Sequence, residues 1–299
     1  METVLIGGGS GFVGMHLSRR LRREGYEVRH LSRSRRPEAE FMTFQWDVRE
    51  QTVDNAAFDD VDYIVNLTGA GIADERWTDE RKAVIVKSRT ESTRLLARSI
   101  DRLQLKPKLY LSASAIGYYG DRGEELLTEE DDPGTGFLST STVMWEQSVE
   151  AVAALGVPVF INRTGIVLHP EEGALQKMLL PLKVRTSTYF GDGQQYYSWV
   201  HIEDIVSIYT FALKQQLTGV YNGTAPNPVR NKHFAEALGP AMGKSALVLP
   251  APVPALKVAL GEMSHTVLDS ARCSAAKIEG AGYRFAYPEL SQALAQLLG

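Results

Sequence analysis

This sequence has a single cysteine, no excess of basic charge and no long apolar run, and each of these features argues against a class of protein. The 299 residues include one cysteine, Cys273, so no internal disulfide can form and a reducing compartment is expected. Lysine and arginine total 32 against 36 aspartates and glutamates, and the net charge of −4 argues against a nucleic-acid partner. No apolar run is long enough to cross a bilayer, so no membrane partner is expected either.

A leader sequence and a metal site are not expected. The first predicted strand begins at Thr3, which leaves no room for a signal or transit peptide and predicts a cytoplasmic protein. The six histidines show no metal-ligand spacing. His201 stands where a helix opens, and we expect it to pack or to cap that helix rather than to act as a base. As partners we expect a small-molecule substrate, with the chain either monomeric or a homodimer.

A strand, a glycine-rich turn and a helix are predicted at the start of the chain. Thr3–Gly7 is a short apolar run, and the glycines after it follow the spacing G-x-x-G-x-x-G. The first lets the chain turn, the second lets backbone approach a pyrophosphate, and the third lets the helix pack closely on the strand. We expect cofactor contacts from these glycines and from the first helical residues: Gly8, Gly11, Gly14, Phe12 and Val13.

The end of the second strand predicts which dinucleotide binds. This strand runs from Glu27 to Leu31 and is followed by Ser32 and Arg33, with no acid before Glu38. An NAD site usually places an acid here for the ribose 2′-hydroxyl, whereas arginine suits a 2′-phosphate. The alternative is a solvated basic run at a strand end. The position favours NADP, with Ser32 and Arg33 as contacts.

Strands and helices alternate through the first half, which predicts a parallel sheet with helices on both faces. Strands are expected at 3–7, 27–31, 41–46, 63–67, 109–112, 157–162 and 220–222, and helices at 79–103, 139–155 and 173–184. The fold class is therefore α/β, a Rossmann-type doubly wound sheet with a smaller mixed α/β C-terminal lobe. We expect residues 1–165 plus about 200–224 in the NADP-binding domain, and 166–199 and 225–299 in a substrate-binding lobe.

Several short motifs, in this order, resemble the extended short-chain dehydrogenases/reductases. They are also similar to an atypical, NADP-binding subgroup of sugar-nucleotide epimerase-like proteins, and the likeness covers essentially the whole chain. Its marks are the glycine turn, Ser32-Arg33, Asn66-Leu67-Thr68-Gly69, Ser88-Arg89, Ser114…Tyr118-Tyr119-Gly120, Trp145-Glu146, Arg163 and Ser198-Trp199-Val200-His201. The resemblance implies a substrate cleft at the carboxyl ends of the strands, and further cofactor contacts at Leu67, Thr68, Gly69, Arg89 and Val167.

The sequence departs from the family at the catalytic residues. The family uses a serine or threonine, a tyrosine and a lysine four residues after that tyrosine. Ser114 matches the serine, but the tyrosine place falls on Leu138 and the lysine place on Thr142. A phenol with an ordinary pKa of about 10 lies some three units, or about 4 kcal/mol, from use at pH 7 without a nearby cation. Tyr118 and Tyr119 are the phenols closest to Ser114 in sequence, although one of them is expected to be simple aromatic packing.

Two functions follow from this pattern. The first is an NADP(H)-binding oxidoreductase or epimerase that acts by hydride transfer on a small substrate such as a sugar nucleotide. Its catalytic residues would be Ser114 with Tyr118 or Tyr119. The alternative is a catalytically degenerate NADP(H)-binding regulator or interaction protein. The missing tyrosine and lysine favour the second function, and the retained Ser114 favours the first.

Overall fold

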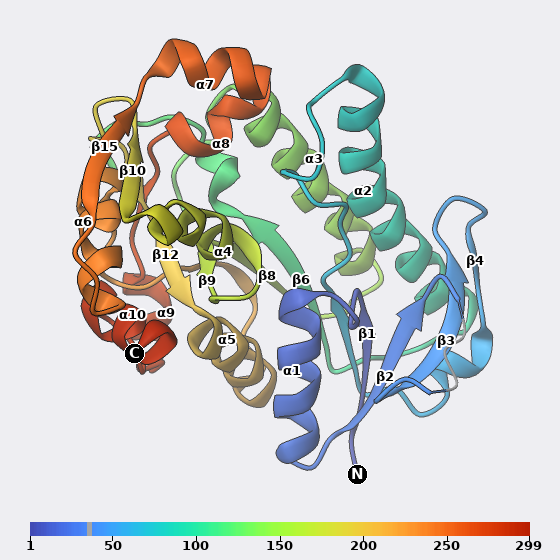
Figure 1. The fold of residues 1–299 in the computed structure, drawn as a ribbon. Coiled ribbons are helices and arrows are strands. Elements are labelled where there is room, and N and C mark those ends of the chain that lie inside the picture. Colours follow the sequence, from blue (N-terminus) through green and yellow to red (C-terminus); the bar gives the residue numbers. More distant parts are fainter. Residues whose placement is uncertain (35–37) are drawn as a thin grey trace.

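The computed structural model describes residues 1–34 and 38–299, and a mostly parallel sheet forms its centre (Figure 1). Within the described residues this sheet has eight strands in the order β13-β8-β6-β5-β1-β2-β3-β4. Every neighbouring pair is parallel except β3 with β4. The strands are β1 (Thr3–Gly7), β2 (Glu27–Ser32), β3 (Met42–Asp47), β4 (Thr52–Val53), β5 (Tyr63–Asn66), β6 (Leu109–Ala115), β8 (Val159–Thr164) and β13 (Gly219–Gly223).

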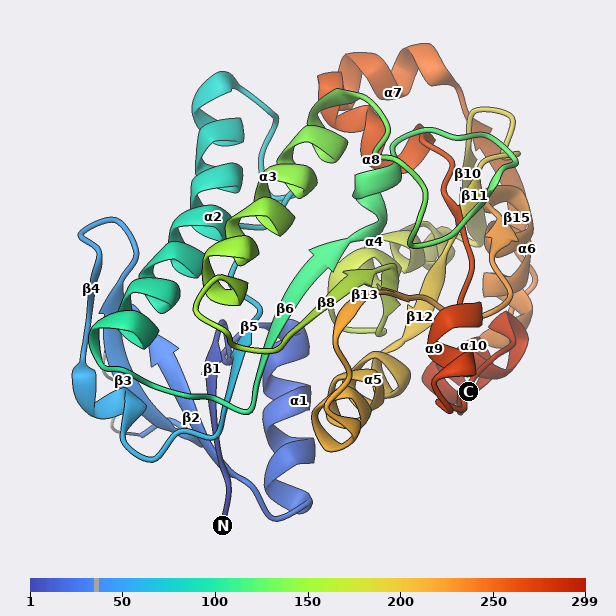
Figure 2. The ribbon, with the colours of Figure 1, turned by 180° about the vertical axis from the view of Figure 1, so that it is seen from behind.

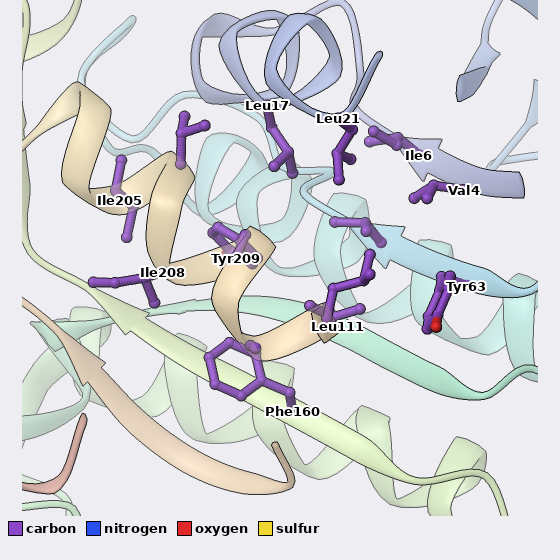
Figure 3. Packing of buried hydrophobic residues seen from close by; sticks show 14 of the residues in the cluster. Val4, Ile6, Leu17, Leu21, Tyr63, Leu111, Phe160, Ile205, Ile208 and Tyr209 are labelled. Atoms are coloured by element: carbon purple, nitrogen blue, oxygen red, sulfur yellow. The ribbon is translucent and has the colours of Figure 1, made fainter. Parts of the chain in front are cut away.

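Helices cover both faces of the sheet, because alternate residues of each strand point to opposite sides. On one face, Val4 and Ile6 of β1 pack with Leu17 of α1 (Phe12–Arg23) and with Ile205 of α5 (Ile202–Gln215), as Figure 3 shows. On the other face, Leu5 packs in a cluster that includes residues of α2 (Asp79–Arg102) and α3 (Gly136–Ala153). The predicted doubly wound Rossmann-type fold is confirmed.

The chain reverses its direction across the sheet between β1 and β5. From β1 the chain adds β2 and β3 on one side and then returns to place β5 on the other, with Gly7 paired to Asn66. Parallel strands bring their carboxyl ends to one edge, and a crevice opens where the strand order reverses. The glycine turn, the residues after β5 and the end of β6 therefore meet at one edge of the sheet.

A smaller set of elements follows β8 and packs beside the sheet (Figure 2). Its apolar cluster includes Leu175, Trp199, Phe234 and Leu294. This separate cluster supports the two-lobe division expected from the sequence, which we retain as a proposal. The elements are β9 (Ile166–Leu168), α4 (Gly173–Leu179), η3 (Leu180–Val184), β10 (Thr186–Phe190), β11 (Tyr196–Tyr197), β12 (Trp199–His201), β14 (Val229–Arg230), α6 (Asn231–Ala241), β15 (Leu247–Ala251), α7 (Val253–Leu260), η4 (Gly261–Ser264), α8 (His265–Leu268), β16 (Arg272–Cys273), α9 (Ala276–Gly280) and α10 (Leu290–Leu298).

Most predicted elements are present with bounds shifted by one to three residues, and two of the differences have a physical reason. β6 extends to Ala115 rather than ending near residue 112, because Ser114 still pairs with Arg163 of β8. The single helix expected over 173–184 divides into α4 and the 3-10 helix η3, which has Pro181 near its start. Proline lacks the N–H that would continue the preceding helix. Among the helices in the described part of the chain, none is long and apolar enough to span a membrane.

His201 has the structural role expected for it. It is buried and forms the N-cap of α5, where its Nδ1 accepts a hydrogen bond from the Glu203 N–H at 3.1 Å. Its Nε2 lies 2.9 Å from Oε1 of Gln296 on α10. The ring is therefore held at both nitrogens, and the prediction that His201 caps or packs is confirmed.

His30 predicts a pH-dependent loss of stability. The residue is 2% exposed, its Nε2 lies 2.7 Å from the Ser18 hydroxyl, and burial lowers its pKa from 6.5 to about 4. Below pH 6.5 the unfolded chain therefore gains a proton that the folded chain takes up only near pH 4, so stability falls as the pH drops through this window. We expect His30 to remove about 2 kcal/mol of unfolding free energy between about pH 7.5 and about pH 5.

Urea denaturation at both pH values measures this effect. His30→Gln should lose less stability than the wild type over the same interval. His233→Gln is the matched control, because His233 is exposed and should leave the pH dependence unchanged. Equal losses in the wild type and His30→Gln would contradict the assignment.

Candidate cofactor and active site

Three glycines shape the turn between β1 and α1, and the fold needs two of them for its own packing. Gly8 has φ +77°, and a Cβ there would stand 2.8 Å from the carbonyl carbon of Leu67. A Cβ at Gly14 would stand 2.3 Å from the Gly8 carbonyl oxygen, so α1 packs on the turn rather than directly on the strand. Gly11 has φ −80° and caps α1 without a side-chain hydrogen bond. Its lack of a side chain leaves the positive end of the helix open to an anion.

Four apolar residues predicted as cofactor contacts lie around this turn: Phe12, Val13, Leu67 and Val167. All are partly buried and pack against one core cluster. A Cβ at Gly173, the first residue of α4, would stand 3.3 Å from the Phe12 ring and 3.6 Å from the Val167 carbonyl oxygen. The start of α4 therefore covers one flank of the turn, and the four contacts remain predictions.

Ser32 and Arg33 stand where β2 reaches the same edge. Ser32 is the last residue of the strand and is 9% exposed, while Arg33 is exposed to solvent. A cavity of about 520 Å³ opens beside them, and its lining includes Ser10 of the glycine turn, His30 and Ser32. The glycine turn and the end of β2 therefore border one space.

The charges around this cavity are partly neutralised. Glu40 lies in its lining and forms ion pairs with Arg19, at 2.9 Å, and with Arg22, at 2.6 Å. Arg35 and Arg36, which continue the basic run after Arg33, lie outside the described residues. Arg33 is thus the basic residue of that run that the structure places at the end of β2.

The residues after β5 are tied to α2 by a buried amide. Asn66 Oδ1 accepts a hydrogen bond from the Thr68 N–H at 3.2 Å, and Asn66 Nδ2 donates to the hydroxyls of Ser92 and Thr93, each at 3.2 Å. The Thr68 hydroxyl itself is buried without a hydrogen-bond partner in the described part of the chain. An orphaned hydroxyl in the interior is costly, and a ligand at this edge could satisfy it.

Arg89 places a positive charge at this edge with no carboxylate partner among the described residues. It donates from Nη1 to the Ile85 carbonyl oxygen at 2.8 Å and lies over the Trp145 ring at 4.9 Å. A Cβ at Gly69 would stand 3.0 Å from the guanidinium carbon. Burial, with a smaller contribution from Arg81, lowers the pKa of Arg89 to about 10. A partly buried cation without a counter-ion suits a phosphate group.

The end of β6 is organised by a buried ion pair. Arg163 donates to both carboxylate oxygens of Glu146, each at 2.9 Å, and the two side chains are 4% and 12% exposed. Ser114 donates its hydroxyl proton to Oε1 of Glu146 at 2.5 Å. A hydroxyl carries one proton, so Ser114 meets any other group through its oxygen lone pairs.

The two candidate tyrosines differ in their surroundings. Tyr119 is fully buried, and its hydroxyl lies 2.8 Å from both the carbonyl oxygen of Thr128 and Oδ1 of Asn222, so its single proton goes to one of these two acceptors. Arg163 donates to the same hydroxyl at 3.0 Å, yet burial raises the pKa of Tyr119. Tyr118 is partly exposed, with the Arg163 guanidinium 3.4 Å from its ring centroid. Its hydroxyl has no hydrogen-bond partner within residues 1–34 and 38–299.

Leu138 and Thr142, which stand at the family's tyrosine and lysine places, make contacts that serve packing and the helix. Leu138 joins an apolar cluster with Trp77 and Met263, and a Cβ at Gly117 would stand 3.4 Å from the Leu138 Cβ. The Thr142 hydroxyl donates to the Leu138 carbonyl at 2.8 Å, within helix α3. Neither side chain carries a proton-transfer group into the site.

Glu146 and Arg163 are among the motif residues that carry the family resemblance, but the sequence indicates no role for either. A pairing of Glu146 with Arg163 depends on the phase of α3 over the sheet, and no local spacing encodes that phase. One feature of the sequence could have suggested the pair. Glu146 and Arg163 carry opposite charges and stand in a predicted helix and a predicted strand, and a charged side chain that is buried usually needs a partner. No cluster of His, Cys, Asp and Glu that could hold a metal is found among the described residues.

Comparison with known proteins yields relatives along the whole chain. The epimerase family protein YfhF of Bacillus subtilis is 36% identical over 295 residues, which cover 97% of this chain and 96% of YfhF. The crystal structure of the human epimerase family protein SDR39U1 (isoform 2) with NADPH has a TM-score of 0.88 at 29% identity, covering 99% of each chain. A nucleoside-diphosphate sugar epimerase from Corynebacterium glutamicum has a TM-score of 0.79 at 31% identity, covering 100% of this chain and 58% of that one.

Two family models match consecutive parts of the sequence. Residues 251–297 match a domain of unknown function, DUF1731. Residues 4–223, which hold the glycine turn and the ends of β5 and β6, match the NAD dependent epimerase/dehydratase family. The resemblance inferred from the motifs is confirmed, and this chain belongs to the NAD dependent epimerase/dehydratase family.

Proposed function

We propose that this protein binds NADP(H) along the carboxyl edge of β1, β2 and β5 and is an oxidoreductase- or epimerase-type enzyme for a small substrate. The observation that carries the proposal is Arg89, a partly buried cation without a described carboxylate partner. It stands at the edge where α1 begins without a side-chain cap and where the Thr68 hydroxyl is orphaned. A ligand that carries phosphate and hydroxyl groups would satisfy all three features.

The phosphate carried by the ribose distinguishes NADP from NAD. Ser32 and Arg33 occupy the end of β2, where an NAD-specific protein usually has an acid. Ser10 and Ser32 border the same cavity, and Arg33 follows Ser32 directly in the chain. The human relative solved with NADPH is consistent with this choice of cofactor.

Ser114 and Tyr118 are the residues that we assign to catalysis. When bound, the nicotinamide ring would supply or accept a hydride. Ser114 would orient the reacting group through its oxygen, because its proton is held by Glu146. Tyr118 would carry the proton, since its hydroxyl is available while that of Tyr119 is enclosed by partners. The likeness to a nucleoside-diphosphate sugar epimerase supports a sugar nucleotide as the substrate class.

A regulator that binds NADP(H) without turnover is the less favoured function. It is supported by Leu138 and Thr142, which stand at the family's tyrosine and lysine places. Against it, the network around Glu146 holds a serine hydroxyl and a partly exposed tyrosine at the same end of β6. A buried ion pair such as Glu146–Arg163 is often no more stabilising than apolar packing, so its presence here favours a role beyond stability.

The cofactor preference tests the first part of the proposal. Fluorescence titration should give a dissociation constant for NADPH at least about tenfold lower than that for NADH, because charge-assisted hydrogen bonds contribute about 1.5–3 kcal/mol. Arg33→Asp should remove most of this preference by placing a like charge beside the 2′-phosphate. Equal affinities of the wild type for the two cofactors would refute the NADP assignment.

Arg89→Met separates a ligand-binding role from a structural one. Methionine keeps much of the side chain's volume and removes a charge that has no described counter-ion, so the free protein should stay as stable or become more stable. NADPH binding should weaken at least about tenfold with the lost charge-assisted bond. Arg98→Met, at an exposed position on the same helix, is the control and should change neither property. A destabilised variant with unchanged NADPH affinity would show that Arg89 serves the fold.

Turnover tests the enzymatic part. Wild-type protein with NADP(H) should convert at least one member of a panel of nucleoside-diphosphate sugars, and analysis of the products measures the conversion. Tyr118→Phe should lower the rate roughly 10²–10⁴-fold, the range of general acid–base contributions. Tyr119→Phe should retain the larger part of the rate in whatever fraction remains folded. Tight NADPH binding without conversion of any panel member would favour the regulator.

A further inference from the structure

The domain of unknown function contacts the loop that leaves the cofactor edge. This loop, residues 70–78, follows Gly69, and the Ala70 N–H donates to the Ser88 hydroxyl at 2.9 Å. Arg76 in the loop donates to the carbonyl oxygen of Val258 on α7 at 3.0 Å. We name residues 253–264, which comprise α7 and η4, the C-terminal arm.

An ion pair and an apolar cluster hold the arm on the first half of the chain. Lys82 at the start of α2 pairs with Glu262 of η4, 180 residues away in sequence. Trp77 and Met263, which neighbour the ion pair in the loop and in η4, are each 9% exposed and share an apolar cluster with Leu138. Leu138 lies beside Gly117, in the stretch between Ser114 and Tyr118. The arm therefore contacts the loop after β5 directly and shares a cluster with Leu138, which faces Gly117, in the region where Figures 1 and 2 draw α7 near the start of α3.

The rest of the domain is anchored through buried contacts. Both carboxylate oxygens of Asp204 on α5 accept hydrogen bonds, from the Tyr283 hydroxyl at 2.8 Å and from the backbone N–H groups of Ala286 at 2.8 Å and Tyr287 at 2.9 Å. Asp204 is 1% exposed. β16 also pairs in parallel with β7 (Leu126–Leu127). This end of the domain is fixed to the large lobe.

The arm, by contrast, has few buried residues. α7 has none, η4 contributes Met263 and Ser264, and Val258 at the contact of α7 with the loop is 78% exposed. The side chains of Lys82 and Glu262 are 24% and 43% exposed, and exposed ion pairs contribute little to stability. Elements with few buried contacts open at low cost while the anchored core stays folded. The arm can therefore separate from the loop without unfolding the domain.

We propose that the C-terminal arm is a lid, through which the domain of unknown function closes the nicotinamide end of the cleft. Closure places Trp77 and Met263 over the space beside Ser114 and Tyr118 and excludes water from it. The inference rests on the proposed function, because NADP(H) is the ligand that the lid retains. Release of the cofactor then requires the Lys82–Glu262 contact to break.

The dissociation rate of NADPH tests the lid. Stopped-flow displacement should show roughly three- to tenfold faster release from Lys82→Glu, because two like charges then face each other. The double variant Lys82→Glu with Glu262→Lys restores the opposite charges and should return the rate to within about twofold of the wild type. Lys87→Glu is the control at an exposed position of the same helix and makes the same change in net charge.

Each result supports or overturns one proposal. An unchanged rate in Lys82→Glu overturns the lid, as does faster release that the double variant fails to reverse. Equal acceleration by Lys87→Glu also overturns it, since the effect would then be one of net charge. Wild-type protein that binds no NADPH in equilibrium titration refutes the proposed function itself. Binding with an unaltered rate refutes the lid alone.

Discussion

A bidentate ion pair between Glu146 and Arg163 holds the candidate active site in its arrangement. Arg163 lies on β8 beside Ser114 of β6, and Glu146 reaches both from α3. The carboxylate accepts a hydrogen bond from the Ser114 hydroxyl, and the guanidinium packs on the Tyr118 ring while donating to the Tyr119 hydroxyl. Removing one partner of a buried pair typically costs about 3–5 kcal/mol, because the other charge is left uncompensated. The direction of the Ser114 hydrogen bond and the different environments of the two tyrosines both depend on this pair.

The ends of β5 and β6 differ in the charge that they carry. At the β6 end, Arg163 is neutralised by Glu146, so that end offers a ligand hydrogen bonds and aromatic surface rather than net charge. At the β5 end, Arg89 lacks a described counter-ion, and the uncapped start of α1 adds the positive end of a helix. A ligand with phosphates at one end and an uncharged reacting group at the other matches this division. If NADP(H) binds as we propose, this charge pattern would place its phosphates at the β5 end and its nicotinamide at the β6 end.

Features encoded locally could be predicted from the sequence, whereas those that depend on packing between distant elements could not. The glycine turn, the strand periods and the cap at His201 each follow from a few neighbouring residues, and the structure agrees with them. The choice between Tyr118 and Tyr119 depends on which hydroxyl is enclosed by Thr128, Asn222 and Arg163, and adjacent residues of the same type give no signal for that. The pairing of Lys82 with Glu262 spans 180 residues and depends on how the C-terminal domain docks. The fold and the glycine turn were therefore predictable, whereas the arrangement of side chains around Glu146 was not.

The missing catalytic tyrosine has a structural counterpart in the apolar cluster around Leu138. A phenol at that position would need a hydrogen-bond partner among Trp77, Ile85 and Met263, which offer almost none. Leucine instead gives the C-terminal arm a surface on which to pack, so the departure from the family pattern and the docking of the arm are compatible. The family's tyrosine and lysine positions therefore do not decide whether this site is catalytic, because Leu138 and Thr142 have structural contacts there. Proton transfer requires a group that can reach the reacting atom, and Tyr118, three residues after the end of β6, is the group that we propose for it.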